Sequence, residues 1–174
     1  MEIILAVLLC IVLVVFGGMT MSQGFMSSVD SAALSVEEIT VARGEIMRTE
    51  LSLLSARQLG VDSVEVTLSN SGQMKLASFS KWDVIVHYYD ADGTYYTKWL
   101  PYTEETLDND EWQKLGIYLD AGAETPEVFE PGILNHGEEM KIEAKLSPPP
   151  KNGATVDAII ATPNGIQDSI SFAY

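Results

Sequence analysis

The sequence predicts an α+β fold in which a long N-terminal hydrophobic α-helix precedes an antiparallel β-sandwich, immunoglobulin-like or jelly-roll-like. Three observations support this prediction. Glu2 is the only charged side chain in the first 26 residues. Residues 29–46 then repeat apolar side chains every three or four positions, as an amphipathic helix does. From about residue 48 onward, apolar and polar residues alternate between regularly spaced turns, as in β-strands.

The N-terminal stretch is apolar without a break from residue 3 to residue 16. A helix that is apolar on every side is stable only in lipid or when surrounded by protein. At about 1.5 Å per residue, residues 3–22 span roughly 30 Å, the thickness of the hydrocarbon core of a bilayer. A cleaved secretory signal is disfavoured, because no basic residue precedes Arg43. A lipid anchor and a helix packed against copies of itself both stay open.

The helix is predicted to continue well past a membrane span. Val29, Val36, Ile39 and Ile46 follow helical spacing, and the acidic residues lie mostly off that stripe. A helix that continues to about Met47 would be roughly 70 Å long. Glycine is a weak helix former, which marks four positions as candidates for a kink: Gly17, Gly18, Gly24 and Gly44. The expected domains are the helix over residues 1–47 and the sandwich over residues 48–174.

The sandwich is expected to contain seven or eight strands. Turn signals lie at residues 70–72, 90–93 and 163–165. The expected strands cover residues 49–53, 64–68, 82–89, 94–100, 112–119, 140–146, 156–161 and 169–172, with a short extended piece at Val128 and Phe129.

Composition excludes several classes of function. The 174 residues include 10 Lys and Arg against 25 Asp and Glu, for a net charge of −15, which opposes binding to nucleic acid and to anionic lipid surfaces. Cys10 is the only cysteine, so a disulfide framework is excluded. Neither His87 nor His136 accompanies a nucleophile motif, and phosphate-loop, dinucleotide and zinc patterns are absent. We therefore expect no catalytic site, no cofactor and no assigned metal site.

Two features of the sandwich could still bind a ligand. Calcium takes carboxylate oxygens, which are available from Asp90, Asp92 and the cluster Asp108, Asn109, Asp110 and Glu111. The twelve-residue calcium-loop pattern is absent, and a solvated acidic loop explains the same residues. The second feature is an aromatic-rich hairpin, which contains Tyr88, Tyr89, Tyr95, Tyr96, Trp99 and Tyr102. Alternation along its strands would turn half of these rings toward the core and half outward.

The order of several motifs resembles that of archaeal-type flagellins (archaellins) and related pilins with class III signals. The motifs are RTELS at 48–52, VEVTLSNSG at 64–72, WDVIV at 82–86, PGILNHGE at 131–138 and TPNGI at 162–166. The resemblance covers nearly the whole chain. It implies a helical surface filament, for motility or adhesion, with the apolar helices as its core and the sandwiches outside.

The resemblance also implies partners and a location. These are other copies of the chain, a prepilin-type peptidase, an ATPase-driven assembly machine, and the cytoplasmic membrane before assembly. The implied assembly core consists of Ile3, Ile4, Leu5, Val7, Leu8, Ile11, Val12, Val15 and Phe16. The family's basic leader is absent, so Met1 would be the processed N-terminus, and Glu2 could neutralise its amine. The alternative is a membrane-anchored accessory protein whose sandwich binds the cell envelope or surface layer.

Overall fold

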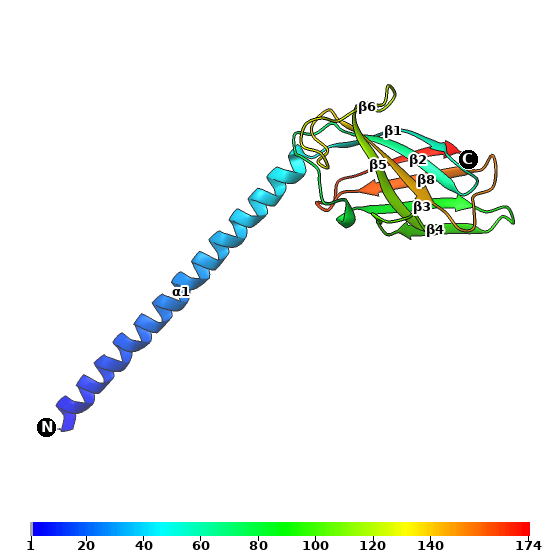
Figure 1. Cartoon of the computed structure of the whole chain (residues 1–174). Coiled ribbons are helices and arrows are strands. Elements are labelled where there is room, and N and C mark those ends of the chain that lie inside the picture. The colour runs from blue at the N-terminus through cyan, green and yellow to red at the C-terminus, as the bar shows by residue number, and fades with distance from the viewer. Residues whose placement is uncertain (1) are drawn as a thin grey trace. The chain divides into compact units, whose positions relative to one another are not determined.

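The computed structural model describes residues 2–174, with side chains from Ile3 onward, and begins with one long helix. Helix α1 (Glu2–Arg48) contains 47 residues and contains no proline. It runs without interruption through all four glycines that sequence marked as candidates for a kink, so the expected kinks do not form (Figure 1). The chain divides after Gly44 into two compact units. The predicted pairing of Glu2 with the terminal amine lies outside the described side chains.

The second unit is an antiparallel β-sandwich, which confirms the predicted fold class. One sheet has the order β1-β2-β7-β5-β6 and the other the order β4-β3-β8-β9. A 3-10 turn, η1 (Phe79–Lys81), precedes β3. The strands are β1 (Leu51–Gln58), β2 (Ser63–Asn70), β3 (Asp83–Tyr89), β4 (Tyr95–Leu100), β5 (Glu111–Asp120), β6 (Thr125–Pro126), β7 (Glu139–Lys145), β8 (Thr155–Ala161) and β9 (Gln167–Ala173).

The core lies between the two sheets and follows the period-two pattern of the sequence. On β3, Val84, Val86 and Tyr88 alternate with more exposed residues and are each 1 % exposed. Leu68 and Trp112 from the five-stranded sheet are fully buried opposite them in the same core cluster. Alternation therefore determines which face of each strand forms the core and which face is left to solvent.

The short extended piece was predicted in the wrong place. Sequence placed it at Val128 and Phe129, whereas β6 pairs Thr125 and Pro126 with the end of β5. The chain then leaves the sheet, with Glu130 in the left-handed region at φ 59°. Val128 and Phe129 are 81 % and 78 % exposed in the loop. Their apolar side chains suggested a strand, but no neighbouring strand is available to pair with them.

The last helical turn, Glu45–Arg48, belongs to the sandwich unit. The Arg48 carbonyl accepts hydrogen bonds from the backbone N–H groups of Gln73 (2.7 Å) and Met74 (3.2 Å). Gly72 sits so close that a Cβ atom there would lie 2.3 Å from the Glu50 nitrogen and 2.6 Å from the Arg48 oxygen. The Asn-Ser-Gly turn at residues 70–72 therefore packs against the C-terminal end of the helix. Only a glycine at position 72 leaves room for this contact.

Candidate assembly surface

The nine predicted assembly-core residues all lie on α1, and their side chains are exposed. Their exposed fractions run from 52 % at Val12 to 80 % at Ile3. Single exposed apolar side chains are common on protein surfaces, but a continuous apolar surface of this length marks an interface with protein or membrane. Assignment of these nine residues to a filament core stays a prediction.

Most of the hydroxyl groups of α1 donate hydrogen bonds to carbonyl groups of the same helix. The Thr20 hydroxyl donates to the carbonyl of Gly17 (3.0 Å), and the Ser28 hydroxyl donates to that of Gly24 (2.9 Å). The same pattern, to a carbonyl three or four residues earlier, holds for Ser27, Ser31, Ser35 and Thr40. These groups can therefore enter an apolar environment without leaving a donor unpaired, which would be costly.

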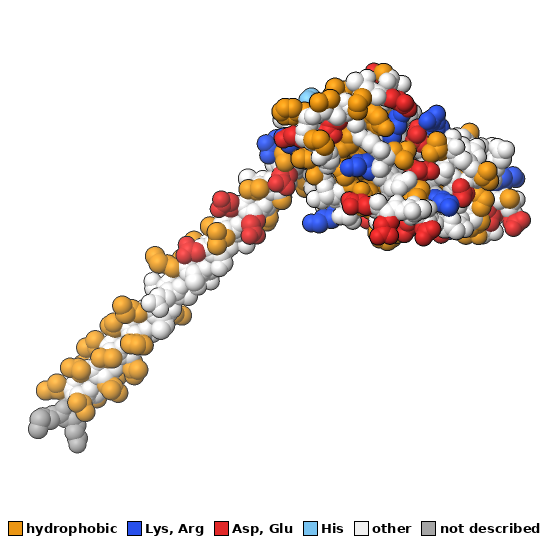
Figure 2. All heavy atoms as spheres, in the orientation of Figure 1, with side chains coloured by type: hydrophobic (Ala, Val, Ile, Leu, Met, Phe, Trp, Pro, Cys, Tyr) orange, Lys and Arg blue, Asp and Glu red, His pale blue; other side chains and the backbone are white. Residues whose placement is uncertain are grey.

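The second half of α1 combines exposed apolar side chains with acidic ones. Figure 2 shows that, among the side chains described from Ile3 onward, the acidic ones of the helix lie along the part nearer its C-terminal end. At about 100° per residue, Val29, Val36, Ile39 and Ile46 fall within a sector of about 100° on one face. They are 40–62 % exposed. We call these four residues the distal stripe.

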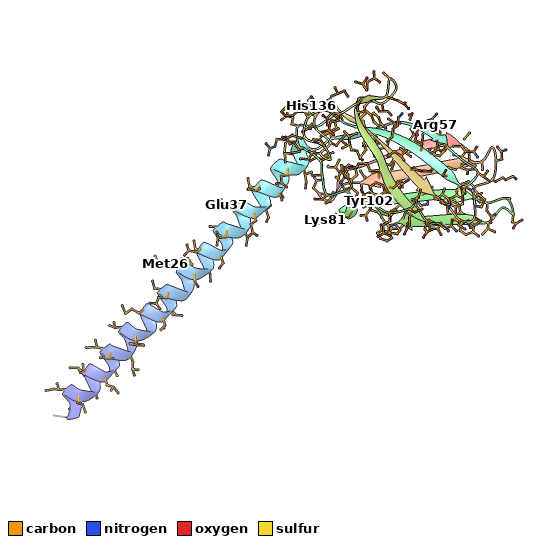
Figure 3. All side chains as sticks on the ribbon, in the orientation of Figure 1. Met26, Glu37, Arg57, Lys81, Tyr102 and His136 are labelled. Carbon is orange, nitrogen blue, oxygen red and sulfur yellow. The ribbon has the colours of Figure 1, made fainter. Side chains whose placement is uncertain are left out.

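Sequence reasoning missed a second apolar pair on this half of the helix. Leu34 and Val41 are 63 % and 58 % exposed. They lie seven residues apart, between acidic positions, on the side away from the distal stripe. Figure 3 shows that the side chains of Met26 and Glu37 both extend away from the helix axis. The i, i+7 spacing of leucine and valine was the signal that could have revealed this pair.

By length and composition, α1 is able to cross a membrane, and it is the one helix in the described part of the chain that is. Cys10 is exposed on this helix. The structure thus leaves both readings of the helix open, a lipid anchor and a polymer core.

Two of the acidic residues considered for calcium, Asp90 and Asp110, have structural partners in the sandwich. The Asp90 carboxylate accepts hydrogen bonds from the backbone N–H groups of Asp92 (3.0 Å) and Thr94 (2.8 Å), which closes the β3–β4 hairpin. The Asp110 carboxylate accepts from the Lys98 amine (2.5 Å) and the Ser147 N–H (2.9 Å). Within residues 2–174, no group of three or more His, Cys, Asp or Glu side chains is arranged to hold a metal.

The two histidines have polar neighbours within the sandwich unit. His136 Nδ1 is 2.7 Å from the Gly72 carbonyl oxygen, and His87 Nδ1 is 2.9 Å from the Thr97 hydroxyl. The aromatic residues divide between the two faces as alternation predicted. The inward group is Tyr88, Tyr96 and Tyr102, and the outward group is Tyr89, Tyr95 and Trp99.

One carboxyl group in the sandwich is poorly solvated. Glu127 Oε1 is buried and has no hydrogen-bond partner among the described residues. Burial raises the pKa of Glu127, and the nearby negative charge of Glu138 raises it further. No sequence signal marked this residue, because its burial depends on how the loop after β6 folds back.

The comparison with known proteins finds similarity in solved structures but not in sequence. The sequence matches no family model and no curated protein. Similar solved structures include the archaellum periplasmic stator complex of FlaF and FlaG from Sulfolobus acidocaldarius (20 % identity, TM-score 0.52, covering 71 % of this chain and 89 % of that chain). The separately solved stator protein FlaG has 20 % identity and a TM-score of 0.51, covering 71 % of this chain and 99 % of that chain.

A third similar structure extends over the helix as well. The archaeal flagellum of Methanospirillum hungatei strain JF1 has 13 % identity and a TM-score of 0.51, with 98 % of this chain and 89 % of that chain covered. At these identities the likeness establishes the fold. It confirms the resemblance to archaellins that the order of motifs predicted, at the level of the fold.

Proposed function

We propose that this chain is a structural subunit of an archaellum-type surface filament that polymerises through its N-terminal helix. One observation carries the proposal. The helix exposes apolar side chains from Ile3 to Ile46, over roughly 65 Å, whereas a bilayer core covers about 30 Å. Lipid accounts for the first half of this surface, but the distal stripe would remain in water. Helices of neighbouring copies would cover both halves.

The energy of such packing supports the proposal. Burying roughly 1,500 Å² of apolar helix surface at about 25 cal/mol per Å² gives tens of kcal/mol before entropy is counted. Contacts that join unlike surfaces and do not close on themselves produce open helical polymers. Under this proposal, residues 1–47 form the filament core and residues 48–174 form the outer domain.

The proposal includes a route to the filament. A prepilin-type peptidase and a membrane ATPase would process and assemble the subunit, which resides in the cytoplasmic membrane beforehand. The finished filament would be extracellular and would serve motility or adhesion through a structural rather than catalytic role.

A second candidate function is a membrane-anchored accessory protein that holds a filament. The observation that favours it is the match of 71 % of this chain to 99 % of the stator protein FlaG. In that case the first half of α1 would lie in lipid and the sandwich would bind the cell envelope or surface layer.

Charge placed on the distal stripe separates the two candidates. Val36 and Leu34 are 62 % and 63 % exposed and lie on different sides of α1, beyond the apolar stretch that lipid would cover. We expect Val36→Asp to prevent filament formation, because it buries a charge at a contact repeated in every subunit. Leu34→Asp is the matched control. Leu34 lies between acidic positions on the side away from the distal stripe, so we expect filaments to form with this variant.

The measurement is shear fractionation of the producing cells, with electron microscopy of the sheared material. The filament proposal expects the wild-type chain as the main protein of thin sheared filaments, with loss of those filaments in Val36→Asp. A chain that stays with the membrane after shearing, in the same amount for both variants, would establish the accessory role instead.

A further inference from the structure

The outer face of the four-stranded sheet carries aromatic side chains that nothing else in the described chain covers. Tyr89, Tyr95 and Trp99 are 51 %, 54 % and 58 % exposed. Tyr95 and Trp99 are four residues apart on β4, so their positions are separated by roughly 13 Å along the strand. We call these three residues the aromatic platform.

Hydrogen bonds and ring contacts hold the platform in place. The Trp99 indole N–H donates to Asp83 Oδ1 at 2.8 Å, which fixes the ring on the sheet. The Tyr95 hydroxyl lies 3.2 Å from His87 Nδ1, and the Tyr95 and His87 rings are nearly parallel, at 7°. The Tyr89 and Tyr95 ring centroids are 5.0 Å apart. A ligand that binds here would therefore lose little side-chain entropy, because the rings are already oriented.

Polar side chains adjoin the platform on the same face. Strand register places Thr97, His87, Asp157 and Ser171 in one row across the four strands. The Ser171 hydroxyl donates to Asp157 Oδ1. The outward positions of these four strands include no Lys or Arg. The face thus combines aromatic rings with neutral and acidic hydrogen-bonding groups.

We propose that this face binds a neutral oligosaccharide. The electron-rich faces of aromatic rings stack on the C–H faces of sugar rings. Carboxylate, imidazole and hydroxyl groups beside them are suited to bind sugar hydroxyl groups. Because this face presents no basic side chains, it is not suited to bind phosphates, nucleic acids or anionic lipids. Contact between two copies through this face would bring like charges together on a chain of net charge −15. The proposal does not depend on whether the chain forms a filament or anchors one.

The test is a titration of the full chain, in a detergent without a sugar head group, with neutral oligosaccharides of glucose, mannose and N-acetylglucosamine. The other two tryptophans, Trp82 and Trp112, are 2 % and 0 % exposed, so a change in tryptophan fluorescence reports mainly on Trp99. We expect a saturable change with at least one oligosaccharide. Calorimetric titration of Trp99→Ala and Tyr95→Ala is expected to show affinity lowered about tenfold or more.

Phe129→Ala is the matched control, since Phe129 is an aromatic residue 78 % exposed outside the platform. It is expected to bind as the wild type does, and thermal unfolding shows whether each variant retains the fold. The proposal is overturned if none of these oligosaccharides binds, or if Trp99→Ala binds as tightly as the wild type. It is also overturned if folded Trp99→Ala alters only the association between copies, which would make the face a subunit contact.

Discussion

The side-chain amide of Asn164 donates a 2.7 Å hydrogen bond to the Thr49 hydroxyl, which lies 115 residues earlier in the chain. That hydroxyl in turn donates to the carbonyl of Glu45 at 2.8 Å. The turn between β8 and β9 is thereby connected to the last turn of α1. Both contacts lie within the sandwich unit, so this unit includes the C-terminal end of the helix.

Removing this amide is expected to weaken the sandwich. Asn164→Ala should lower the free energy of unfolding by about 1–3 kcal/mol, because it removes two hydrogen bonds, the one to Thr49 and one accepted from the Thr162 hydroxyl. Thermal unfolding of the full chain in detergent, followed by near-ultraviolet circular dichroism, measures the change. Asn152→Ala, in an exposed turn, is the control and should unfold as the wild type does. Equal loss in both variants would contradict a specific role for Asn164.

Gly72→Ala is expected to destabilise the sandwich more strongly. The added methyl group would collide with the backbone at Glu50 and Arg48, and backbone cannot move aside as a flexible side chain can. A loss of about 1–3 kcal/mol is typical of such overpacking. Gly122→Ala is the control, because its nearest neighbour is 3.3 Å away and belongs to the Asp120 side chain. Unchanged unfolding of Gly72→Ala would show that the turn can shift.

Glu127 is expected to make stability depend on pH. Its pKa is raised in the folded chain above the ordinary value of 4.5, so the folded state holds the proton more tightly than the unfolded state does. As pH rises between the two pKa values, the unfolded state loses its proton first and folding stability falls. Glu127→Gln should therefore be more stable than wild type near about pH 7, where the carboxyl carries its desolvated charge.

The advantage of Glu127→Gln should shrink as the pH is lowered below 4.5, where the wild-type carboxyl is protonated in both states. Melting temperatures of both chains across this pH range measure the difference. A stability difference that is the same at every pH would show that charge at Glu127 is not its cause.

Leu8→Asp is expected to abolish assembly. A carboxylate at the centre of an apolar helix costs about 2.5–3.5 kcal/mol in a membrane, and each subunit of a polymer would bear a similar cost. Charge at Val7 or Val12 should act in the same way. The amount of sheared filament, counted by electron microscopy, is the measurement. Normal filaments from Leu8→Asp would rule out a buried helical core.

Much of the fold could be predicted because its signals are local. An uncharged run and a change of hydrophobic period from 3.6 to about two were enough to separate α1 from the strands. Alternation also predicted that half of the aromatic rings of the β3–β4 hairpin turn inward and half outward. The prediction of a strand at Val128 and Phe129 was wrong, because two apolar residues in a loop look like a strand when the pairing partner is unknown.

The rest depended on contacts between distant parts of the sequence. The order of strands within each sheet, and the bond between Asn164 and Thr49, follow from tertiary packing that no short window contains. For the candidate site, the apolar run of α1 could be read directly from the sequence. Whether lipid or other helices cover it could not, because both environments favour the same apolar side chains. The burial of Glu127 and the row formed by His87 and Asp157 needed the strand register.

The internal hydrogen bonds of the α1 hydroxyl groups have a consequence for moving the helix between environments. Thr20, Ser28 and the other bonded hydroxyls keep the same partners whether lipid tails or other helices surround them. Exchange of one apolar neighbour for another then neither breaks nor forms these bonds. The preference for one environment would depend on how closely side chains fit, so the same helix could leave a bilayer, enter a bundle and return without a polar barrier at these positions.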